Sequence, residues 1–331
     1  MSNTSKTVLI TGATAGIGRM TALHLAKLGH HVIATGRKPA ELANLKAEAD
    51  AELAAAAIES ARRTNRRHAG KLDTLLLDVT SLASIEAAAR EAESLTHGRG
   101  IDVLVNNAGF GVLGPTSEIS DAEMRRQYET NVFGLMNVTR AFLPKMIERR
   151  AGRVINVSSV GGRITLPYFG VYNSTKYALE SLSDALRYEL RPFGIDVAMI
   201  EPGVIRTTFE ATAVGDLGRL SHTPFAAALG KYEQMSKVAD RFASNPIVIA
   251  KAIARAVEAR RPAARYVAPF STNFVILFAR LFPTRVWDWA MRKVGFLNAK
   301  TLGVTGSAVV PPQPVDVPVS AAKPAEVRAP N

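Results

Sequence analysis

The amino-acid sequence predicts an α/β protein built on one doubly wound parallel sheet. Short runs of β-branched and aliphatic residues alternate with longer helical patterns through most of the 331 residues, which is the rhythm of parallel strands joined by helical crossovers. The runs VLIT, VIAT, DVLVN and VINVS are apolar without alternation, as strands covered on both faces are. We therefore expect about seven strands with helices on both faces of the sheet.

The expected strands follow these runs in chain order. They cover Thr7–Thr11, His31–Thr35, Leu72–Asp78, Ile101–Asn106, Arg153–Ser158 and Asp196–Glu201, with a short last strand near Tyr266. Helices are expected to fill the connections. The connection from Pro39 to Lys71 is unusually long and rich in Ala and Glu, and it predicts an extended helix pair that serves as scaffold.

Three parts of the chain differ in composition. Residues 1–270 carry the strand and helix rhythm and are expected to form a single domain. Residues 271–300 form an apolar, aromatic and basic helical extension, in which Arg280 and Pro283 interrupt the apolar run well before it could span a membrane. This extension, chiefly residues 271–297, suits a peripheral membrane contact or packing on the domain or on a partner subunit. Residues 301–331 are rich in Pro and Ala and predict a disordered tail.

The charge and residue content narrow the function classes. Lys and Arg number 41 against 29 Asp and Glu, a formal charge of +12, which suits an anionic partner such as a phosphorylated cofactor or a membrane surface. No nucleic-acid-binding motif is present, so no nucleic-acid partner is expected. The chain has no Cys and no cluster of metal-ligating residues, so neither disulfides nor a metal site is expected. A strand-like run begins at Thr7, which leaves no room for a signal peptide and predicts a cytoplasmic protein.

A glycine-rich turn follows the first strand. It reads Thr11-Gly12-Ala13-Thr14-Ala15-Gly16-Ile17-Gly18 and leads into a helix. Glycines permit a tight turn, let backbone N–H groups approach a pyrophosphate at the helix N-terminus, and allow the helix to pack close to the sheet. The turn therefore predicts a Rossmann-type dinucleotide site.

The spacing Gly-x-x-x-Gly-x-Gly resembles the glycine motif of the short-chain dehydrogenase/reductase family. The resemblance covers roughly residues 6–270 and recurs at several places in the family's order. The further matches are Asn106-Asn107-Ala108-Gly109, Asn131, Ser159, Tyr172, Lys176, Pro202-Gly203 and Thr207. The short segments Val160-Gly161-Gly162 and Leu166-Pro167 are similar to those of the branch that contains 17β-hydroxysteroid and retinol dehydrogenases.

Tyr172 and Lys176 are the central pair of candidate catalytic residues. They lie four residues apart, so a phenol and an ammonium share one face of a helix. A neighbouring cation favours the phenolate, which predicts that Lys176 lowers the pKa of Tyr172. The resemblance implies that Tyr172 is the general acid and base, that Ser159 assists it, and that Asn131 supports a proton relay; Ser158 is the alternative serine. No Gly-x-Ser-x-Gly elbow surrounds either serine, which argues against a hydrolase.

The cofactor choice depends on the end of the second strand. Arg37 and Lys38 follow it and no carboxylate stands in the segment Ala34 to Lys38, so we expect NADP(H) to be preferred over NAD(H). The resemblance implies that Asp78 and Val79 contact the adenine and that Ile205 and Thr207 hold the nicotinamide carboxamide. The expected cofactor-binding residues are Gly12, Thr14, Ala15, Gly16, Ile17, Gly18, Arg37, Lys38, Asp78, Val79, Asn107, Ala108, Gly109, Tyr172, Lys176, Pro202, Gly203, Ile205 and Thr207.

The expected reaction is the interconversion of a carbonyl and an alcohol on a lipophilic substrate, resembling a steroid, a retinoid or a long-chain aldehyde. Residues 208–245 suit a mobile lid over an apolar substrate, or a simple helical excursion that packs on the sheet. The alternative functions are a 3-oxoacyl thioester reductase and a non-catalytic NADPH-binding sensor. Residues 121–149 and 171–193 resemble the family's dimerising helices, so a homo-oligomer is expected.

Overall fold

The computed structural model describes residues 5–64, 70–207, 217–239 and 243–304. These residues form a seven-stranded sheet in the order β3-β2-β1-β4-β5-β6-β7, and every pair of neighbouring strands is parallel. The strands are β1 (Thr7–Ile10), β2 (His31–Gly36), β3 (Lys71–Leu76), β4 (Val103–Asn106), β5 (Gly152–Val157), β6 (Ile195–Pro202) and β7 (Arg265–Ala268). The prediction of a doubly wound parallel sheet is confirmed.

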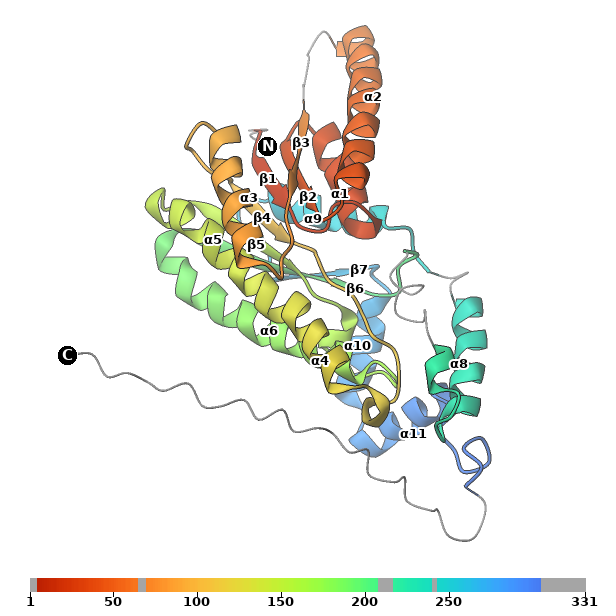
Figure 1. Cartoon of the computed structure of the whole chain (residues 1–331). Coiled ribbons are helices and arrows are strands. Elements are labelled where there is room, and N and C mark those ends of the chain that lie inside the picture. The colour runs from red at the N-terminus through yellow and green to blue at the C-terminus, as the bar shows by residue number, and fades with distance from the viewer. Residues whose placement is uncertain (1–4, 65–69, 208–216, 240–242, 305–331) are drawn as a thin grey trace, which may run out of the picture.

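Helices cover both faces of this sheet (Figure 1). The main helices are α1 (Gly16–Lys27), α2 (Pro39–Thr64), α3 (Leu82–Leu95), α4 (Asp121–Tyr128), α5 (Leu135–Glu148), α6 (Gly170–Leu190), α8 (Ala226–Ala239), α9 (Ile247–Glu258), α10 (Thr272–Leu281) and α11 (Thr284–Val294). A π-helical turn over Glu129–Gly134 joins α4 to α5, and short 3-10 turns include Val160–Gly162 and Leu217–Leu220.

Alternate side chains of each buried strand enter two separate cores. Val8 and Ile10 belong to the core under α1, α2 and α9, which also contains Leu25, Leu45 and Ile253. Leu9 points to the opposite face and joins a second core with Ala88 and Phe142, residues of α3 and α5. Because both faces of each strand are buried, the strands are apolar without alternation.

The sheet order reverses between β1 and its two neighbours, β2 and β4. At such a reversal the loops after adjacent strands diverge to opposite faces of the sheet and leave a crevice at the carboxyl ends of the strands. The glycine-rich turn after β1 and the Asn-Asn-Ala-Gly segment after β4 both lie at this edge. The topology therefore brings together motifs that are about ninety residues apart.

Several sequence expectations about element limits were wrong. The connection after β2 holds one helix, α2, of 26 residues rather than a helix pair, because no Gly or Pro interrupts its helix-forming residues between Pro39 and Thr64. β3 ends at Leu76 and β4 begins at Val103. Asp78, expected at the end of the third strand, therefore lies in the loop that leads to α3. Ile101, expected at the start of the fourth strand, lies before β4.

Parts of the predicted lid and tail lie outside the described residues, namely residues 208–216 and 240–242 of the lid and 305–331 of the tail. The described part of the lid consists of a 3-10 turn at Leu217–Leu220 and the helix α8. The C-terminal extension folds as α10 and α11. Among the helices that the structure describes, none has the length and apolar content needed to cross a bilayer.

Candidate active site

The glycine-rich turn is held against the segment that follows β4. Gly12 and Gly16 have φ of +65° and +53°, a left-handed conformation that strains other residues. A Cβ on Gly12 would lie 2.9 Å from the Cα of Ala108, and a Cβ on Gly18 would lie 2.3 Å from the carbonyl oxygen of Gly12. These positions require glycine, since a side chain would push the turn away from β4 and α1.

The start of α1 has the properties of an anion site. Ala15 is the N-cap and provides no side-chain hydrogen bond to the first turn, which contains no acidic residue. The first backbone N–H groups of a helix have no intrahelical acceptor, and the helix dipole favours a negative charge beside them. The turn therefore fits the pyrophosphate of a dinucleotide. Ile17, one residue into the helix, packs on the core below.

Asn107 and Thr11 fix the shape of this turn. The Asn107 Nδ2 donates to the carbonyl oxygens of Thr11 at 3.0 Å and Gly12 at 3.1 Å. The Thr11 hydroxyl accepts from the backbone N–H groups of Asn107 and Ala108, each at 3.0 Å. Four hydrogen bonds therefore join the glycine-rich turn to the expected cofactor-binding residues Asn107 and Ala108.

The three predicted catalytic residues Ser159, Tyr172 and Lys176 come together at the carboxyl end of β5. Ser159 caps the 3-10 turn, its hydroxyl accepts from the Gly161 N–H at 3.0 Å, and it is hydrogen-bonded to Tyr172. Tyr172 and Lys176 are both buried in α6, only 9% and 7% exposed, and the Lys176 Nζ lies 5.7 Å from the centre of the Tyr172 ring. The geometry favours Ser159 over Ser158, which is buried beside Glu180.

Burial dominates the electrostatics of this pair. It raises the pKa of Tyr172 to about 12, an effect that the hydrogen bond with Ser159 opposes. It also lowers the pKa of Lys176 to about 8, against the attraction of Glu180. In this structure the net shift of the Tyr172 pKa is upward, because burial disfavours the phenolate. That Lys176 favours the phenolate stays a prediction.

Lys176 and Asn131 are both tied to neighbouring backbone. The Lys176 Nζ donates to the carbonyl oxygen of Val157 at 2.9 Å. The Asn131 amide lies in the π-helical turn, where it donates to the Phe110 carbonyl at 2.9 Å and to the Thr175 hydroxyl at 3.1 Å, and accepts from the Phe110 N–H at 3.1 Å. A Cβ on Gly109 would lie 3.1 Å from the Asn131 Oδ1 and 3.9 Å from the Lys176 Nζ. Asn131 therefore joins the segment after β4 to α6.

Sequence reasoning missed a charged cluster behind Lys176. The Arg265 guanidinium on β7 contacts Glu180 at 3.2 Å, Asp184 at 2.7 Å and Glu201 at 3.0 Å. Arg163 pairs with Glu201 at 2.7 Å, and burial raises the pKa of Glu180. Glu180 lies one helical turn after Lys176, which is the one signal in the sequence that could have placed it on the same face.

A carboxylate also lies beside the predicted cofactor-selecting cations. Arg37 and Lys38 are exposed at the end of β2, and the Lys38 Nζ donates to Glu41 at 2.7 Å. Hydrogen bonds from Lys38 and Thr14, and the charge of Arg37, hold the pKa of Glu41 below its ordinary value. The expectation that no carboxylate is available there covered only residues 34–38 and overlooked the first turn of α2.

Asp78 and Val79 occupy the loop before α3. The Asp78 Oδ1 accepts from the backbone N–H of Thr80 at 2.9 Å and from its hydroxyl at 2.7 Å, while Ser81 is the N-cap of α3. The positive charge of Arg37 and the two Thr80 hydrogen bonds outweigh burial, so the pKa of Asp78 is lowered. Val79 is buried, and its carbonyl oxygen lies against Gly134.

The segment after β6 reaches back to the glycine-rich turn. Gly203 donates its N–H to Ala268 at 2.9 Å, and a Cβ on it would lie 2.2 Å from the Thr272 hydroxyl. Ile205 is buried and forms an isolated bridge with Ser244. A Cβ on Gly16 would lie 3.5 Å from the Thr207 side chain. The glycine-rich turn and the segment after β6 therefore meet, and Pro202 is the last residue of β6.

An apolar cluster lies next to Tyr172, and Phe169 connects the two. We call it the substrate-side cluster; its buried members are Leu113, Tyr168, Leu220, Ala228 and Leu229, and Phe169, Leu217, Phe225, Tyr232, Phe296, Leu297 and Leu302 pack on it. Phe169 also meets the Tyr172 ring edge-on, with centroids 6.1 Å apart. The cluster thus joins α8, the loop before α6 and the end of the C-terminal extension.

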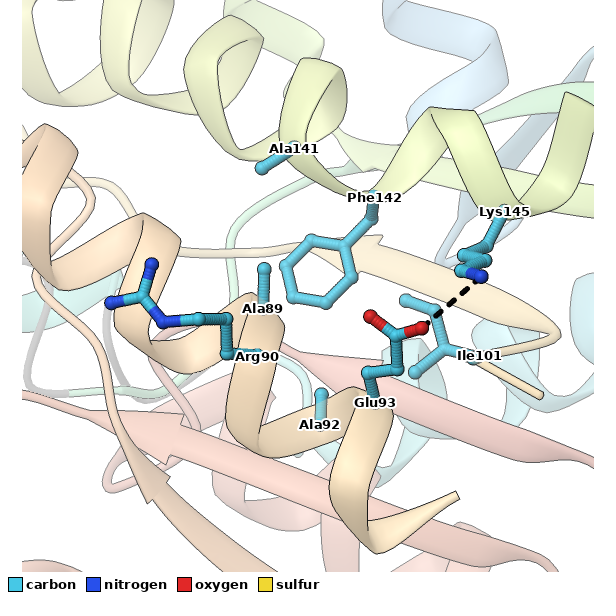
Figure 2. A pocket seen from close by; sticks show the side chains of 9 residues that line it. Ala89, Arg90, Ala92, Glu93, Ile101, Ala141, Phe142 and Lys145 are labelled. Atoms are coloured by element: carbon cyan, nitrogen blue, oxygen red, sulfur yellow. Dashed lines mark ion pairs between the residues drawn. The ribbon is translucent and has the colours of Figure 1, made fainter. Parts of the chain in front are cut away.

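A hollow elsewhere in the fold belongs to a different part of the molecule. Figure 2 shows it between α3 and α5, where Phe142 lies on its floor and Lys145 pairs with Glu93 at 3.1 Å. None of the predicted site residues lines it. The apolar side chains and the single ion pair are those of a helix packing contact rather than of a reaction site.

The chain matches one family over most of its length. The sequence model described as short chain dehydrogenase matches residues 6–217. The chain is 36% identical to "Uncharacterized oxidoreductase YbbO" of Escherichia coli K12, over 86% of this chain and 93% of that protein. It is 32% identical to the 3-ketodihydrosphingosine reductase of Bacteroides thetaiotaomicron, over 86% and 96%, and 36% identical to human 17-beta-hydroxysteroid dehydrogenase type 1, over 78% and 76%.

Solved structures show the same fold. A short-chain dehydrogenase from Streptomyces avermitilis superposes with a TM-score of 0.67 at 30% identity, covering 89% of this chain and 99% of that one. A serine dehydrogenase complexed with NADP⁺ superposes with a TM-score of 0.64 at 28% identity, covering 79% and 93%. Structural neighbours thus include nicotinamide-cofactor enzymes with this sheet.

Proposed function

Because the chain belongs to the short-chain dehydrogenase/reductase family and is an oxidoreductase of that family, we propose that it uses NADP(H) to interconvert a carbonyl and an alcohol on a lipophilic substrate. The observation that carries the proposal is the hydrogen-bonded pair of Ser159 and Tyr172, which lies one helical turn from the buried Lys176. The Lys176 Nζ lies near Gly109, and Phe169, which packs on the substrate-side cluster, contacts the Tyr172 ring.

The proposed chemistry assigns a step to each polar group. Bound NADPH supplies the hydride, and negative charge develops on the carbonyl oxygen as it is transferred. The hydroxyls of Ser159 and Tyr172 donate hydrogen bonds to that oxygen, and Tyr172 gives up its proton to it. Lys176, whose pKa is about 8, is mostly charged near neutral pH and stabilises the phenolate that Tyr172 leaves behind. In alcohol oxidation the same phenolate takes the proton back.

The cofactor proposal rests on the residues that would hold each part of NADP(H). The free N–H groups at the start of α1 suit the pyrophosphate. The exposed guanidinium of Arg37 suits a 2′-phosphate, since its planar fork matches phosphate oxygens. Lys38 adds a second cation, but its ammonium is already hydrogen-bonded to Glu41. Arg37 is therefore the main residue that would select NADP(H) over NAD(H). The solved relative that binds NADP⁺ supports this choice.

The substrate proposal rests on the apolar surroundings of Tyr172. The side chains of Tyr168, Phe169 and Leu220 offer hydrocarbon and aromatic surface beside the reacting group, which suits a lipid-like ketone or alcohol. Two relatives are named for a ketosphingoid base and a hydroxysteroid, and both names agree with that class. A thioester reductase and a sensor without turnover are the alternatives that an assay must exclude.

We further propose that the enzyme is a homo-oligomer. α6 and the turn before α5 expose three large side chains, Phe133, Tyr177 and Tyr188, which are 54%, 44% and 66% exposed. α4 and α6 pack against each other in the same layer. A second copy that covered this surface would bury aromatic side chains that the single chain leaves in water.

A substrate panel tests the proposed function. Steroid ketones, retinaldehyde, 3-keto long-chain lipids and 3-oxoacyl thioesters are each incubated with the purified protein and NADPH or NADH, and cofactor oxidation is followed by absorbance. We expect turnover of at least one lipid ketone or aldehyde with NADPH at a higher kcat/KM than with NADH. Turnover of thioesters alone, or NADPH binding without turnover of any compound, would contradict the proposal.

A further inference from the structure

The two helices of the C-terminal extension leave most of their apolar side chains in solvent. In α10 only Thr272 and Ile276 are buried, and α11, which is described in full, buries no side chain. Phe274, Leu281 and Trp289 are 64%, 70% and 59% exposed. We call this surface the C-terminal face; its main apolar residues are Phe270, Phe274, Leu277, Phe278, Leu281 and Trp289.

Ring contacts link several aromatic side chains of this face. Phe274 and Phe278 are spaced four residues apart and lie on one side of α10, and Phe270 lies in the turn that precedes this helix. The rings of Phe270 and Phe274 meet edge-on at 5.8 Å. Phe278 stacks on Phe282 at 4.0 Å and lies 6.3 Å from Trp287 of α11, ring centre to ring centre. These ring contacts join the apolar side chains of α10 to Trp287 of α11.

Cations surround this surface. Arg280, Arg285, Arg292 and Lys293 are exposed, whereas Asp288 is the one acidic residue in residues 271–304. On α11, Trp289 lies one helical turn from Arg285, Arg292 and Lys293. A hollow lined by Trp289, Arg292, Lys293 and Leu297 opens at the same place. Aromatic rings among long cationic side chains suit a boundary between apolar and anionic layers.

We propose that the C-terminal face docks on the surface of an anionic phospholipid bilayer. The apolar residues enter the boundary of the acyl chains, and the four cations contact the phosphate groups. Charge decides against a second copy of the chain as the occupant, since two such faces would bring eight cations together with two carboxylates. The protein lies on the membrane without crossing it, because no described helix is long and apolar enough to span.

The C-terminal face adjoins the substrate side of the molecule. The Tyr168 hydroxyl donates to the Gly295 carbonyl, and Phe296 and Leu297, which follow α11, pack on the substrate-side cluster. In Figure 1, α8, α10 and α11 lie together at the end of the molecule away from α2. If the proposed function holds, docking brings the substrate-side cluster close to a layer in which lipid substrates dissolve. The docking itself does not depend on that function.

Vesicle co-sedimentation of the full-length protein tests the docking. Vesicles of pure phosphatidylcholine are compared with vesicles of phosphatidylcholine and phosphatidylglycerol in equal parts, at about 0.1 M salt. We expect binding to the anionic vesicles, weak binding to the neutral ones, and release as salt rises. The Arg285→Gln, Arg292→Gln, Lys293→Gln triple variant should partition about a hundredfold less, since each cation near such a surface contributes roughly a factor of five.

Apolar and charge variants need matched controls. Phe274→Ser with Leu281→Ser removes apolar side chains from the C-terminal face and should abolish most binding. Leu82→Ser changes a side chain that is equally exposed, 61%, at the start of α3, and Lys251→Gln with Arg255→Gln removes exposed cations from α9. Both controls should bind as the wild type does. Circular dichroism and NADPH binding confirm that each variant is folded.

Three results would overturn the docking proposal. The first is absence of wild-type binding to anionic vesicles. The second is an equal loss of vesicle binding in the α9 charge variant and in the C-terminal face variants. That result would show that the protein adsorbs to anionic vesicles by net charge alone. The third is a wild-type oligomer that Phe274→Ser with Leu281→Ser dissociates in size-exclusion chromatography without any vesicle binding, which would assign the face to a second copy. Failure of the substrate panel would leave the vesicle results unaffected.

Discussion

At the scale of single residues, the site depends on two ionisable side chains that the fold largely buries. Lys176 and Tyr172 are buried together, and each is shifted toward its neutral form, with pKa values of about 8 and about 12. Spacing in the sequence predicted that they meet, since residues four apart share a helix face. It could not predict the direction of the tyrosine shift, because burial depends on strands and loops that lie far away in the chain.

The buried lysine predicts a pH dependence of stability. The pKa of Lys176 falls from 10.5 to about 8 on folding, so between these values the unfolded chain holds a proton that the folded chain has lost. Stability should therefore rise with pH in this window, by up to about 3 kcal/mol for this group. Urea unfolding of the cofactor-free protein, measured from roughly pH 7.5 to roughly pH 10.5, gives the slope across the window that the two pKa values set.

Lys176→Met supplies the control for this measurement. Tyr172 and other groups titrate in both proteins, so the difference between the two stability curves isolates Lys176. The free energy of unfolding of the wild type should increase relative to that of the variant as the pH rises through the window. Parallel curves would show that Lys176 is not desolvated in the folded protein.

Arg37 predicts a selective effect on cofactor affinity. Arg37→Ala removes the exposed guanidinium at the end of β2 and should weaken NADPH binding about ten- to a hundredfold, the value of a charge-assisted contact, with little change for NADH. Lys38→Ala should have a smaller effect, because its ammonium pairs with Glu41. Fluorescence titration of the wild type and both variants with each cofactor measures the six affinities. An equal loss for NADPH and NADH would contradict the assignment.

At the scale of elements, the glycines that matter are those where helix or turn backbone approaches another backbone. Gly18 in α1 and Gly230 in α8 are both helical, and a general rule of helix propensity treats them alike. The structure separates them, since a Cβ on Gly18 would meet the Gly12 carbonyl oxygen at 2.3 Å, whereas a Cβ on Gly230 would meet nothing within 4 Å. The motif indicated which glycine lies at the site, but only the packing shows why.

This contrast predicts opposite effects of one substitution. Gly18→Ala should destabilise the fold by about 1–3 kcal/mol, through overpacking against backbone, and should weaken cofactor binding. Gly230→Ala should be neutral or stabilise by up to about 1 kcal/mol. Thermal unfolding with and without NADPH measures both effects. A Gly18→Ala protein as stable as the wild type, with unchanged cofactor affinity, would show that the turn has more room than the structure indicates.

At the scale of the whole molecule, the sequence predicted the sheet well and some of the helices poorly. Buried parallel strands leave a strong signal because both faces must be apolar. The single long helix α2 was misread as two, and the cluster of Arg265, Glu180 and Glu201 was missed, because its members come from α6, β6 and β7. The contact of Gly295, Phe296 and Leu297 with the loop before α6 joins distant segments in the same way.

The proposed proton transfer by Tyr172 is the central claim about the whole molecule, and Tyr172→Phe tests it most directly. The variant keeps the ring that packs on Phe169 and loses only the hydroxyl. Tyr177→Phe, on the same helix but 44% exposed, is the matched control. With the ketone identified by the substrate panel, Tyr172→Phe should reduce it about a hundred- to ten-thousandfold more slowly at unchanged NADPH affinity, while Tyr177→Phe keeps the wild-type rate. Turnover of Tyr172→Phe at the wild-type rate would contradict the account.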